Sequence, residues 1–277
     1  MKRKGIALFC VLFALSMLFV GCGSERKQGK TEVNIFIAAS LENATKEIIP
    51  LYKEKHPEVN IIYSADSSGT LMTQIQEGYE CDIFFSADTK QMDILEQEGL
   101  VLDGKRKDML KNEVVLIAGK GNGTKVTGLS NLNQASSIAL ADGSVPVGKY
   151  TRVAMVKAGI LSKTKDPSSI TTKEIMKQLG TEINECANVS KVKEAVKEGS
   201  CEVGTVYYTD AYSVLDDVEI LEHISKNLTG EIIYPIGMIQ NSEADETQMK
   251  AAEDFYQFIQ SEEAAAVFEK YLYTVNR

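Results

Sequence analysis

The stretch VNIFIAASLENA, residues 33–44, carries the pattern that decides the fold of this chain. Val33–Ala38 is an apolar run followed by small residues, which predicts a buried strand that ends near Ser40. A helical pattern begins directly after it, and its apolar face consists of Leu41, Ala44, Ile48 and Tyr52. A strand that passes straight into a helix is the building unit of an α/β fold.

The same strand-to-helix unit recurs along the chain. Further strands are predicted at residues 59–64, 82–86, 113–118 and 137–141, before Asn188, and at 203–208 and 232–239. Helical patterns begin near Thr70, Thr89, Val147 and Val189, and two more cover residues 246–259 and 262–271. Consecutive strands joined by helices run parallel, and no linker rich in Pro, Gly or Ser separates the units. We therefore expect an α/β protein with two discontinuous lobes, each a mainly parallel sheet flanked by helices.

The first 21 residues are typical of an export signal peptide. Basic residues at positions 2–4 precede an apolar run that ends in Gly21 and Cys22, and this run is too short to span a bilayer comfortably. A small residue directly before a cysteine predicts lipoprotein processing, which leaves Cys22 as the acylated first residue. A plain secretory signal and an uncleaved anchor are the alternatives. Residues 22–30 would then be a lipidated tether that holds the protein on the outer face of the cytoplasmic membrane.

The mature chain is acidic. The 277-residue sequence has a formal net charge of −9, and loss of the signal peptide removes three basic residues and no acid, which gives −12. Nucleic acid and anionic lipid head groups bind basic surfaces, so neither is an expected partner. About 255 residues remain, which is enough for one large or two medium domains.

Three cysteines, Cys81, Cys186 and Cys201, lie outside the signal and the anchor position. An odd number cannot pair completely. Cys186 and Cys201 are expected at opposite ends of neighbouring parallel strands, beyond the reach of a disulfide. We expect all three to be small core residues. The two histidines, His56 and His223, are expected on the surface, and the sequence has no cysteine and histidine spacing typical of zinc.

Several predicted strands end in polar residues just before a helix. Ser40, Ser68 and Asn188 occupy such positions, and residues 142–148 lead into the helix near Val147. Helix N-termini present unpaired N–H groups with partial positive charge, and in open α/β sheets they meet at the carboxyl ends of the strands, where ligands bind. Each of these residues is also a common helix cap. Because the units form two sets, the sequence favours an anion held between two lobes by neutral donors.

Five spaced motifs lie between Ala38 and Ala211. They are AASLENA at 38–44, SSGTL at 67–71, CDIFFSAD at 81–88, VPVGKY at 145–150 and VYYTDA at 206–211. In this order they resemble the molybdate-binding proteins of ABC importers, and the resemblance extends from about Val33 to the end of the chain. It implies a two-lobe periplasmic-binding-protein type II fold with a ligand cleft between the lobes. Residues 31–112 and 234–277 would form lobe 1, and residues 113–233 would form lobe 2.

The resemblance also implies the ligand-binding residues. In that family an oxyanion is held by two serine hydroxyls, backbone amides and a tyrosine hydroxyl. The matching positions are Ser40, Ser68, Val147, Val189 and Tyr207. Adjacent Tyr208 leaves open which of the two rings turns inward. No catalytic residue, cofactor or direct protein–metal ligand is implied, because molybdate or tungstate is bound through its oxygens.

The function implied is that of a monomeric, exported receptor. It would capture molybdate, and also tungstate, and deliver it to an ABC permease with a cytoplasmic ATPase. A receptor for another tetrahedral oxyanion, such as sulfate, is one alternative, since neutral donors distinguish anions mainly by size.

Alternatives of other classes are an extracellular hydrolase and an inert surface scaffold. A serine hydrolase is disfavoured because the sequence has no Gly-x-Ser-x-Gly motif. A carboxylate pair could serve another hydrolase, but the candidate aspartates flank turns, so we expect caps and loop braces. These aspartates are Asp66, Asp88, Asp142 and Asp210.

Overall fold

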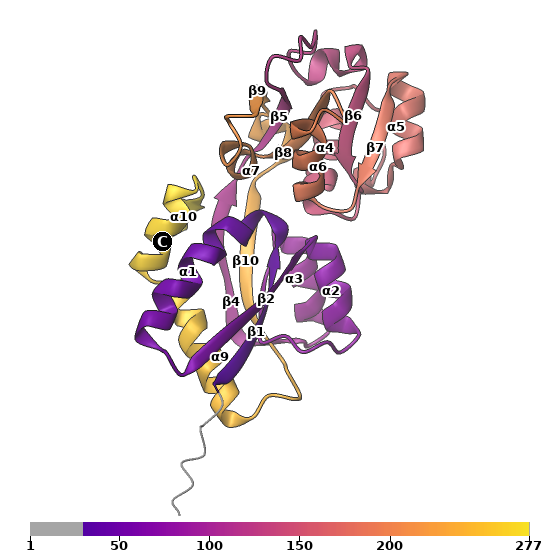
Figure 1. The fold of residues 1–277 in the computed structure, drawn as a ribbon. Helices are drawn as coiled ribbons and strands as arrows, with labels where there is room; N and C mark the ends of the chain where they lie inside the picture. Colours follow the sequence, from indigo (N-terminus) through magenta and orange to yellow (C-terminus); the bar gives the residue numbers. More distant parts are fainter. Residues whose placement is uncertain (1–29, 277) are drawn as a thin grey trace, which may run out of the picture.

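A computed structural model describes residues 30–276 (Figure 1). The predicted signal peptide, the predicted lipidation site Cys22 and the tether up to residue 29 lie outside the described residues. Within residues 30–276, no helix has the length and apolar character that crossing a membrane requires.

The described residues form two lobes, one around each of two β-sheets (Figure 1). The first lobe consists of β1 (Thr31–Ala38), η1 (Ala39–Leu41), α1 (Glu42–Lys55), β2 (Val59–Asp66), α2 (Ser68–Gln76), β3 (Ile83–Phe85), α3 (Thr89–Gln97), β4 (Val101–Asn112), β10 (Ile232–Ile239), α9 (Glu246–Ile259), α10 (Glu262–Lys270) and β11 (Thr274–Val275). The second lobe consists of β5 (Val114–Gly119), η2 (Leu129–Gln134), β6 (Ser137–Ala141), α4 (Pro146–Lys157), η3 (Pro167–Ser169), α5 (Thr172–Leu179), β7 (Glu182–Cys186), α6 (Val189–Lys197), β8 (Val203–Tyr207), α7 (Tyr208–Tyr212), β9 (Val218–His223) and α8 (Lys226–Thr229).

Local residues fix where the helices near the strand ends begin. The Ser67 side chain accepts a hydrogen bond from the Thr70 amide, and the Asn188 side chain accepts one from the Lys191 amide. α4 begins with Pro146, whose fixed φ suits the first helical position. Each helix can therefore start within a few residues of the strand before it.

Both sheets are mixed rather than mainly parallel. The first has the order β11-β4-β10-β3-β1-β2, in which β1 is parallel to β2 and β3. The second has the order β7-β6-β8-β5-β9, in which β6 is parallel to β7 and β8. The other pairs are antiparallel. The prediction of mainly parallel sheets is wrong in this respect, because β5 and β10 each enter a lobe from the other lobe and run against the strands that end there.

Two chain segments cross between the lobes. The first leaves β4 at Asn112 and enters β5 at Val114. The second enters β10 at Ile232, which already pairs with Asn112 of β4. The predicted boundary at residue 234 therefore lies inside β10, and the crossing comes just before Ile232.

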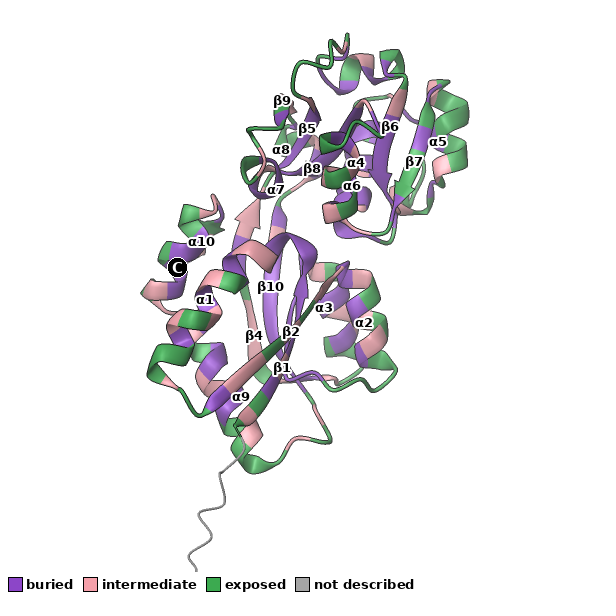
Figure 2. Cartoon of the chain, viewed as in Figure 1, coloured by how far each residue is buried: buried purple, intermediate pink, exposed green. Residues whose placement is uncertain are grey.

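Buried apolar residues fill the space between the sheets and their helices (Figure 2). α9 packs on β1 and α10 packs on α1, while α6 packs on β8 and β6. Cys81, Cys186 and Cys201 are buried free thiols, so the prediction that they are small core residues is confirmed. β7 and β8 are not neighbours as expected, because β6 lies between them.

Candidate functional site

The parallel strands of each lobe end level with one another. In the first sheet, Ala38 at the end of β1 lies opposite Asp66 at the end of β2. In the second sheet, Ala141 at the end of β6 lies opposite Cys186 at the end of β7. The helical segments η1, α2, α4 and α6 begin just beyond these ends. Helix N-termini from both lobes can therefore contribute to one site.

A small cavity lies between the lobes at these helix starts. It is lined by Ala38, Ala39, Ser40, Asp66, Ser67, Ser68, Ala87, Val145, Pro146, Val147, Asn188, Val189 and Tyr207. All five ligand-binding residues expected from the sequence are among them. The cavity has a volume of about 10 Å³, roughly the space of one water molecule. Drug-sized ligands fill roughly 300–1,000 Å³, so this cavity suits only a very small ligand.

Two serine hydroxyls are positioned to donate into the cavity. Ser68 is the first residue of α2, and its Oγ accepts a hydrogen bond of 2.9 Å from the Ala87 amide. Ser40 lies in η1, and its Oγ is 3.0 Å from the Tyr234 hydroxyl. This hydroxyl accepts a hydrogen bond of 3.1 Å from Asn112 Nδ2, so its own hydrogen is available to Ser40. Since both serine oxygens then act as acceptors within the protein, each serine keeps its O–H for a ligand.

The position of Ser40 is braced from the boundary between the lobes. Tyr273 Oη donates a hydrogen bond of 2.8 Å to the backbone oxygen of Ser40. Tyr234 belongs to β10 and Asn112 ends β4, the strands nearest the two crossings. Asn112 Nδ2 also donates to Thr209 Oγ1 of the second lobe at 3.0 Å. Ser40 is thus connected by hydrogen bonds to the segments about which the lobes would rotate.

Backbone amides of the second lobe supply further donors. Val147 is the second residue of α4, and Val189 is the first residue of α6. Amides in the first turn of a helix have no acceptor within the helix, and the partial positive charge there favours an anion. Pro146 has no N–H, so Val147 provides the first amide of α4. Both valine side chains are buried, so they form an apolar part of the wall beside these amides.

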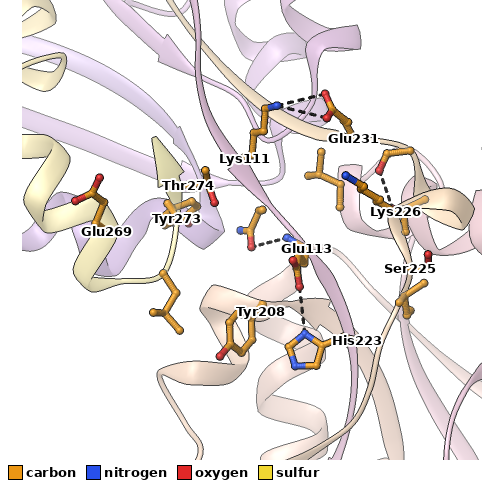
Figure 3. A pocket seen from close by; sticks show the side chains of 16 residues that line it. Lys111, Glu113, Tyr208, His223, Ser225, Lys226, Glu231, Glu269, Tyr273 and Thr274 are labelled. Carbon is orange, nitrogen blue, oxygen red and sulfur yellow. Dashed lines mark hydrogen bonds and ion pairs between the residues drawn. The ribbon is translucent and has the colours of Figure 1, made fainter. Parts of the chain in front are cut away.

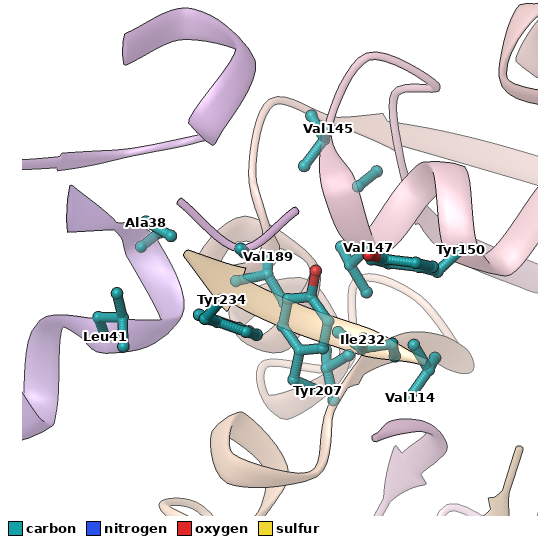
Figure 4. Packing of buried hydrophobic residues seen from close by; sticks show 14 of the residues in the cluster. Ala38, Leu41, Val114, Val145, Val147, Tyr150, Val189, Tyr207, Ile232 and Tyr234 are labelled. Atoms are coloured by element: carbon teal, nitrogen blue, oxygen red, sulfur yellow. The ribbon is translucent and has the colours of Figure 1, made fainter. Parts of the chain in front are cut away.

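Tyr207 lines the cavity, whereas Tyr208 faces elsewhere. Tyr207 is 1% exposed, and its hydroxyl points between Val147 and Val189 in Figure 4. Among the described residues this hydroxyl has no hydrogen-bond partner. Burial raises the pKa of Tyr207 well above its usual value, so the hydroxyl stays protonated and can donate. The partly buried Tyr208 ring packs against His223, with 4.8 Å between the ring centroids.

Two polar contacts join the lobes beside the cavity. Asn188 Nδ2 of the second lobe donates to Asp66 Oδ1 of the first at 2.9 Å, and this oxygen also accepts from the Ser67 amide at 2.7 Å. Lys149 Nζ of α4 forms an ion pair with Asp88, whose side chain is 1% exposed. Both carboxylates are therefore bound to donors rather than turned as bare charges toward an anion.

The four aspartates expected to be caps and braces divide into two groups. Asp66 holds the turn before α2, Asp88 caps α3, and Asp142 accepts hydrogen bonds from the amide and hydroxyl of Ser144. For Asp210 the prediction is wrong, because its carboxyl is buried in α7. Its Oδ2 atom has no hydrogen-bond partner in the part of the chain that the structure describes. Burial raises the pKa of Asp210 to about 7.

Both histidines lie outside the cavity. His56 follows α1 and stacks on Tyr52, with ring centroids 4.3 Å apart. His223 lies in a separate groove at the lobe boundary, where its Nδ1 is 3.1 Å from Glu113 Oε2 (Figure 3). By the same measure this groove is larger, about 710 Å³, and none of its lining residues belongs to the cavity. The cavity, with its convergent donors, is therefore the better candidate for a small anion.

Sequence reasoning missed the residues that hold these donors in place. Tyr234, Tyr273 and Asn112 are distant from Ser40 in sequence, and nothing local indicates their contact with it. One indirect signal exists, because the family resemblance puts the lobe crossings near Asn112 and Tyr234. The ion pair of Lys149 with Asp88 joins two of the quoted motifs, but no sequence pattern pairs them.

The sequence is similar to those of known bacterial solute-binding proteins. A family model described as bacterial extracellular solute-binding protein matches residues 33–274. The chain is 31% identical over 276 residues to YvgL of Bacillus subtilis, whose name describes an ABC transporter substrate-binding lipoprotein, and 98% of each chain is covered. It is 30% identical over 227 residues to the molybdate-binding protein ModA of Mycobacterium tuberculosis, with 79% of this chain and 80% of the relative covered.

Solved structures show the same fold. The periplasmic molybdate-binding protein of Azotobacter vinelandii superimposes with a TM-score of 0.71 and 19% sequence identity, covering 88% of this chain and 100% of that protein. At this identity the likeness concerns the fold.

Proposed function

The chain belongs to the family of bacterial extracellular solute-binding proteins, and from this membership we propose that it captures molybdate outside the cytoplasm and delivers it to an ABC permease. Tungstate is the second ligand we propose. The relative ModA is named for molybdate binding, and YvgL is named as a lipoprotein of an ABC transporter. Both likenesses support the proposal.

The observation that carries the proposal is the set of neutral donors around the cavity. The hydroxyls of Ser40, Ser68 and Tyr207 and the amides of Val147 and Val189 all belong to residues that line it. Hydrogen bonds from neutral donors to an anion are stronger than those to a neutral acceptor. Because no lysine or arginine is among the described lining residues, the anion is not held by an ion pair and can be released to a permease.

A receptor for sulfate or another tetrahedral oxyanion remains the alternative within this class. The donors carry no full charge, so they distinguish molybdate from sulfate by the size of the closed cavity. The valine side chains at positions 147 and 189 are rigid at χ1 and form part of that wall.

We propose no covalent chemistry for this site. The described lining contains no histidine or cysteine, and its one carboxylate, Asp66, is bound by Asn188 and Ser67. Receptor function also accounts for the proposed acylation of Cys22, which would keep a monomeric protein beside its permease and raise their effective concentration.

Calorimetric titration of the chain without residues 1–22 tests the proposal. We expect tight one-to-one binding of molybdate and tungstate, and much weaker binding of sulfate. Ser40→Ala and Ser68→Ala should each weaken binding strongly, and the double variant should abolish it while circular dichroism shows an intact fold. An absence of molybdate heat, or sulfate binding of equal strength, would contradict the proposed ligand.

A further inference from the structure

Arg152 is a fully buried cation in the second lobe. It lies in α4 and is 0% exposed. Its Nε donates to the carbonyl of Ile170 at 2.8 Å, and its Nη1 donates to those of Ala141 and Gly148 at 2.7 and 3.0 Å. Buried arginines are usually paired with a carboxylate, whereas this one is bonded to carbonyl groups.

Among the described residues, the charge of Arg152 has no close counter-ion. None of the ion pairs formed within residues 30–276 includes it, and its Nη2 has no hydrogen-bond partner among those residues. Burial lowers the pKa of Arg152, while Asp142 and Glu185 act against this from farther away. A guanidinium remains protonated in proteins, so a positive charge stays in this low-dielectric region.

The guanidinium lies against the loop that forms one wall of the cavity. Ala141 is the last residue of β6, and Gly148 directly follows Val147, whose amide is one of the proposed donors. A Cβ atom on Gly143 would lie 3.4 Å from Arg152 Nε, so the loop backbone packs directly on the guanidinium. The charge is therefore behind the donors rather than in the cavity.

We infer that Arg152 is a specificity-determining residue that makes the site select doubly charged tetrahedral anions over singly charged ones of similar size. The inference rests on the proposed function. Neutral donors such as Ser40 and Tyr207 distinguish anions by size and geometry, whereas a buried cation adds a Coulomb interaction that doubles when the ligand charge doubles. Because the charge is not a direct ligand, it strengthens binding without an ion pair that would have to break on release.

Coulomb's law gives the scale of this effect. The Gly148 carbonyl accepts a hydrogen bond from the guanidinium, and the preceding residue, Val147, lines the cavity. We therefore take a separation of about 10 Å between the cation and a bound anion for use in Coulomb's law. At an effective dielectric constant of about 20, such a cation changes affinity by roughly tenfold for each unit of ligand charge. Loss of the charge should thus weaken the binding of a dianion about a hundredfold and the binding of a monoanion about tenfold.

Two substitutions distinguish the effect of the Arg152 charge from the effect of its hydrogen bonds to the loop. Arg152→Gln retains a donor for the loop carbonyls and removes the charge, whereas Arg152→Lys retains the charge with fewer donors. Calorimetry measures the affinity of each variant and the wild type for two anions of similar shape. These are molybdate, a dianion, and perrhenate, a monoanion. The affinity for the weaker ligand is measured by competition with the stronger one. Thermal unfolding checks the fold.

The ratio of molybdate to perrhenate affinity is the deciding measurement. We expect this ratio to fall about tenfold in Arg152→Gln and to stay within about twofold of wild type in Arg152→Lys. If Arg152 only braced the loop, its replacement would weaken the binding of both anions equally. An unchanged affinity ratio in Arg152→Gln therefore overturns the inference. If Arg152→Gln does not fold, Arg152→Lys provides the test. A fall of about tenfold in the ratio of molybdate to perrhenate affinity in Arg152→Lys would also overturn the inference. Absence of molybdate binding to the wild type would instead reject the proposed function.

Discussion

Replacement of Lys149 by methionine tests whether the contacts between the lobes govern ligand affinity. Lys149 belongs to α4 of the second lobe, and Asp88 caps α3 of the first. Domain closure brings such groups together, so their ion pair contributes only when the lobes are closed. Lys149→Met would leave the Asp88 carboxylate, 1% exposed, without its cation in the closed form.

The magnitude follows from the burial of the pair. Removal of one partner of a buried ion pair costs about 3–5 kcal/mol, because the other charge remains desolvated. The Lys149 side chain is 25% exposed, so we take the lower end, about 3 kcal/mol. Burial and then the nearby Asp88 charge raise the pKa of Tyr150, so the Asp88 carboxylate also lies close to this ring. Apparent molybdate affinity should fall about a hundredfold.

Titration calorimetry on three variants measures this effect. Lys149→Met should show the full loss, and Asp88→Asn with Lys149→Met should recover at least tenfold, since asparagine can still cap α3. Lys191→Met is the matched control, because its pair with Glu194 is exposed and lies within α6; it should change affinity less than twofold. Equal affinities of the Lys149 variant and the wild type would refute the reasoning, as would a double variant no better than the single one.

Three further predictions concern single side chains. Tyr207→Phe should weaken ligand binding by about 1.5–3 kcal/mol, the range for a hydrogen bond to a charged group, whereas Tyr208→Phe should leave the titration unchanged; equal losses would contradict the inward position of Tyr207. Ser261→Ala removes the cap of α10 and should lower the free energy of urea unfolding by about 1 kcal/mol without affecting ligand affinity. Ser68→Ala should lower both the free energy of unfolding and the ligand affinity. Burial raises the pKa of Asp210 from 3.8 to about 7, so the folded state binds more protons between these values. Its stabilising contribution is complete below about pH 4 and is lost as the pH rises through 7. Relative to Asp210→Asn, the wild type should therefore lose about 3 kcal/mol of unfolding free energy from pH 4 to 7, and a constant difference would disprove this.

Most residues that line the candidate cavity could be predicted from the sequence, because they lie in local strand-to-helix turns. Residues 33–44 hold an apolar run, Ser40 and an amphipathic helix in one short stretch, and β1 and α1 follow that order. The same local logic applies to Ser68 and Val189. Such local patterns can be recognised in a single sequence, because helix caps and hydrophobic periodicity involve only a few neighbouring residues.

Other elements depend on distant partners and leave no local signal. β4 extends over Val101–Asn112 and carries many charged residues without alternation. It is a strand because β10 pairs along it and because Arg106 forms ion pairs with Asp93 and Glu96. In β4, pairing with a strand that is distant in sequence outweighs the low strand propensity of its own residues. Arg152 is similar, since its charge predicts exposure, and only the carbonyl groups that surround it make burial possible.

The position of β10 has a consequence for how the chain is made. β10 lies between β3 and β4 in the first sheet, although the whole second lobe separates it from them in sequence. During synthesis the ribosome must therefore reach β10 (Ile232–Ile239) before β4 can be joined to β3 in the first sheet, and pairing over such a sequence distance is slow. The N-terminal half stays unfinished while the chain is short. For the export that we propose, this order of events is an advantage, because the chain can cross the membrane before its first lobe has closed into a stable unit.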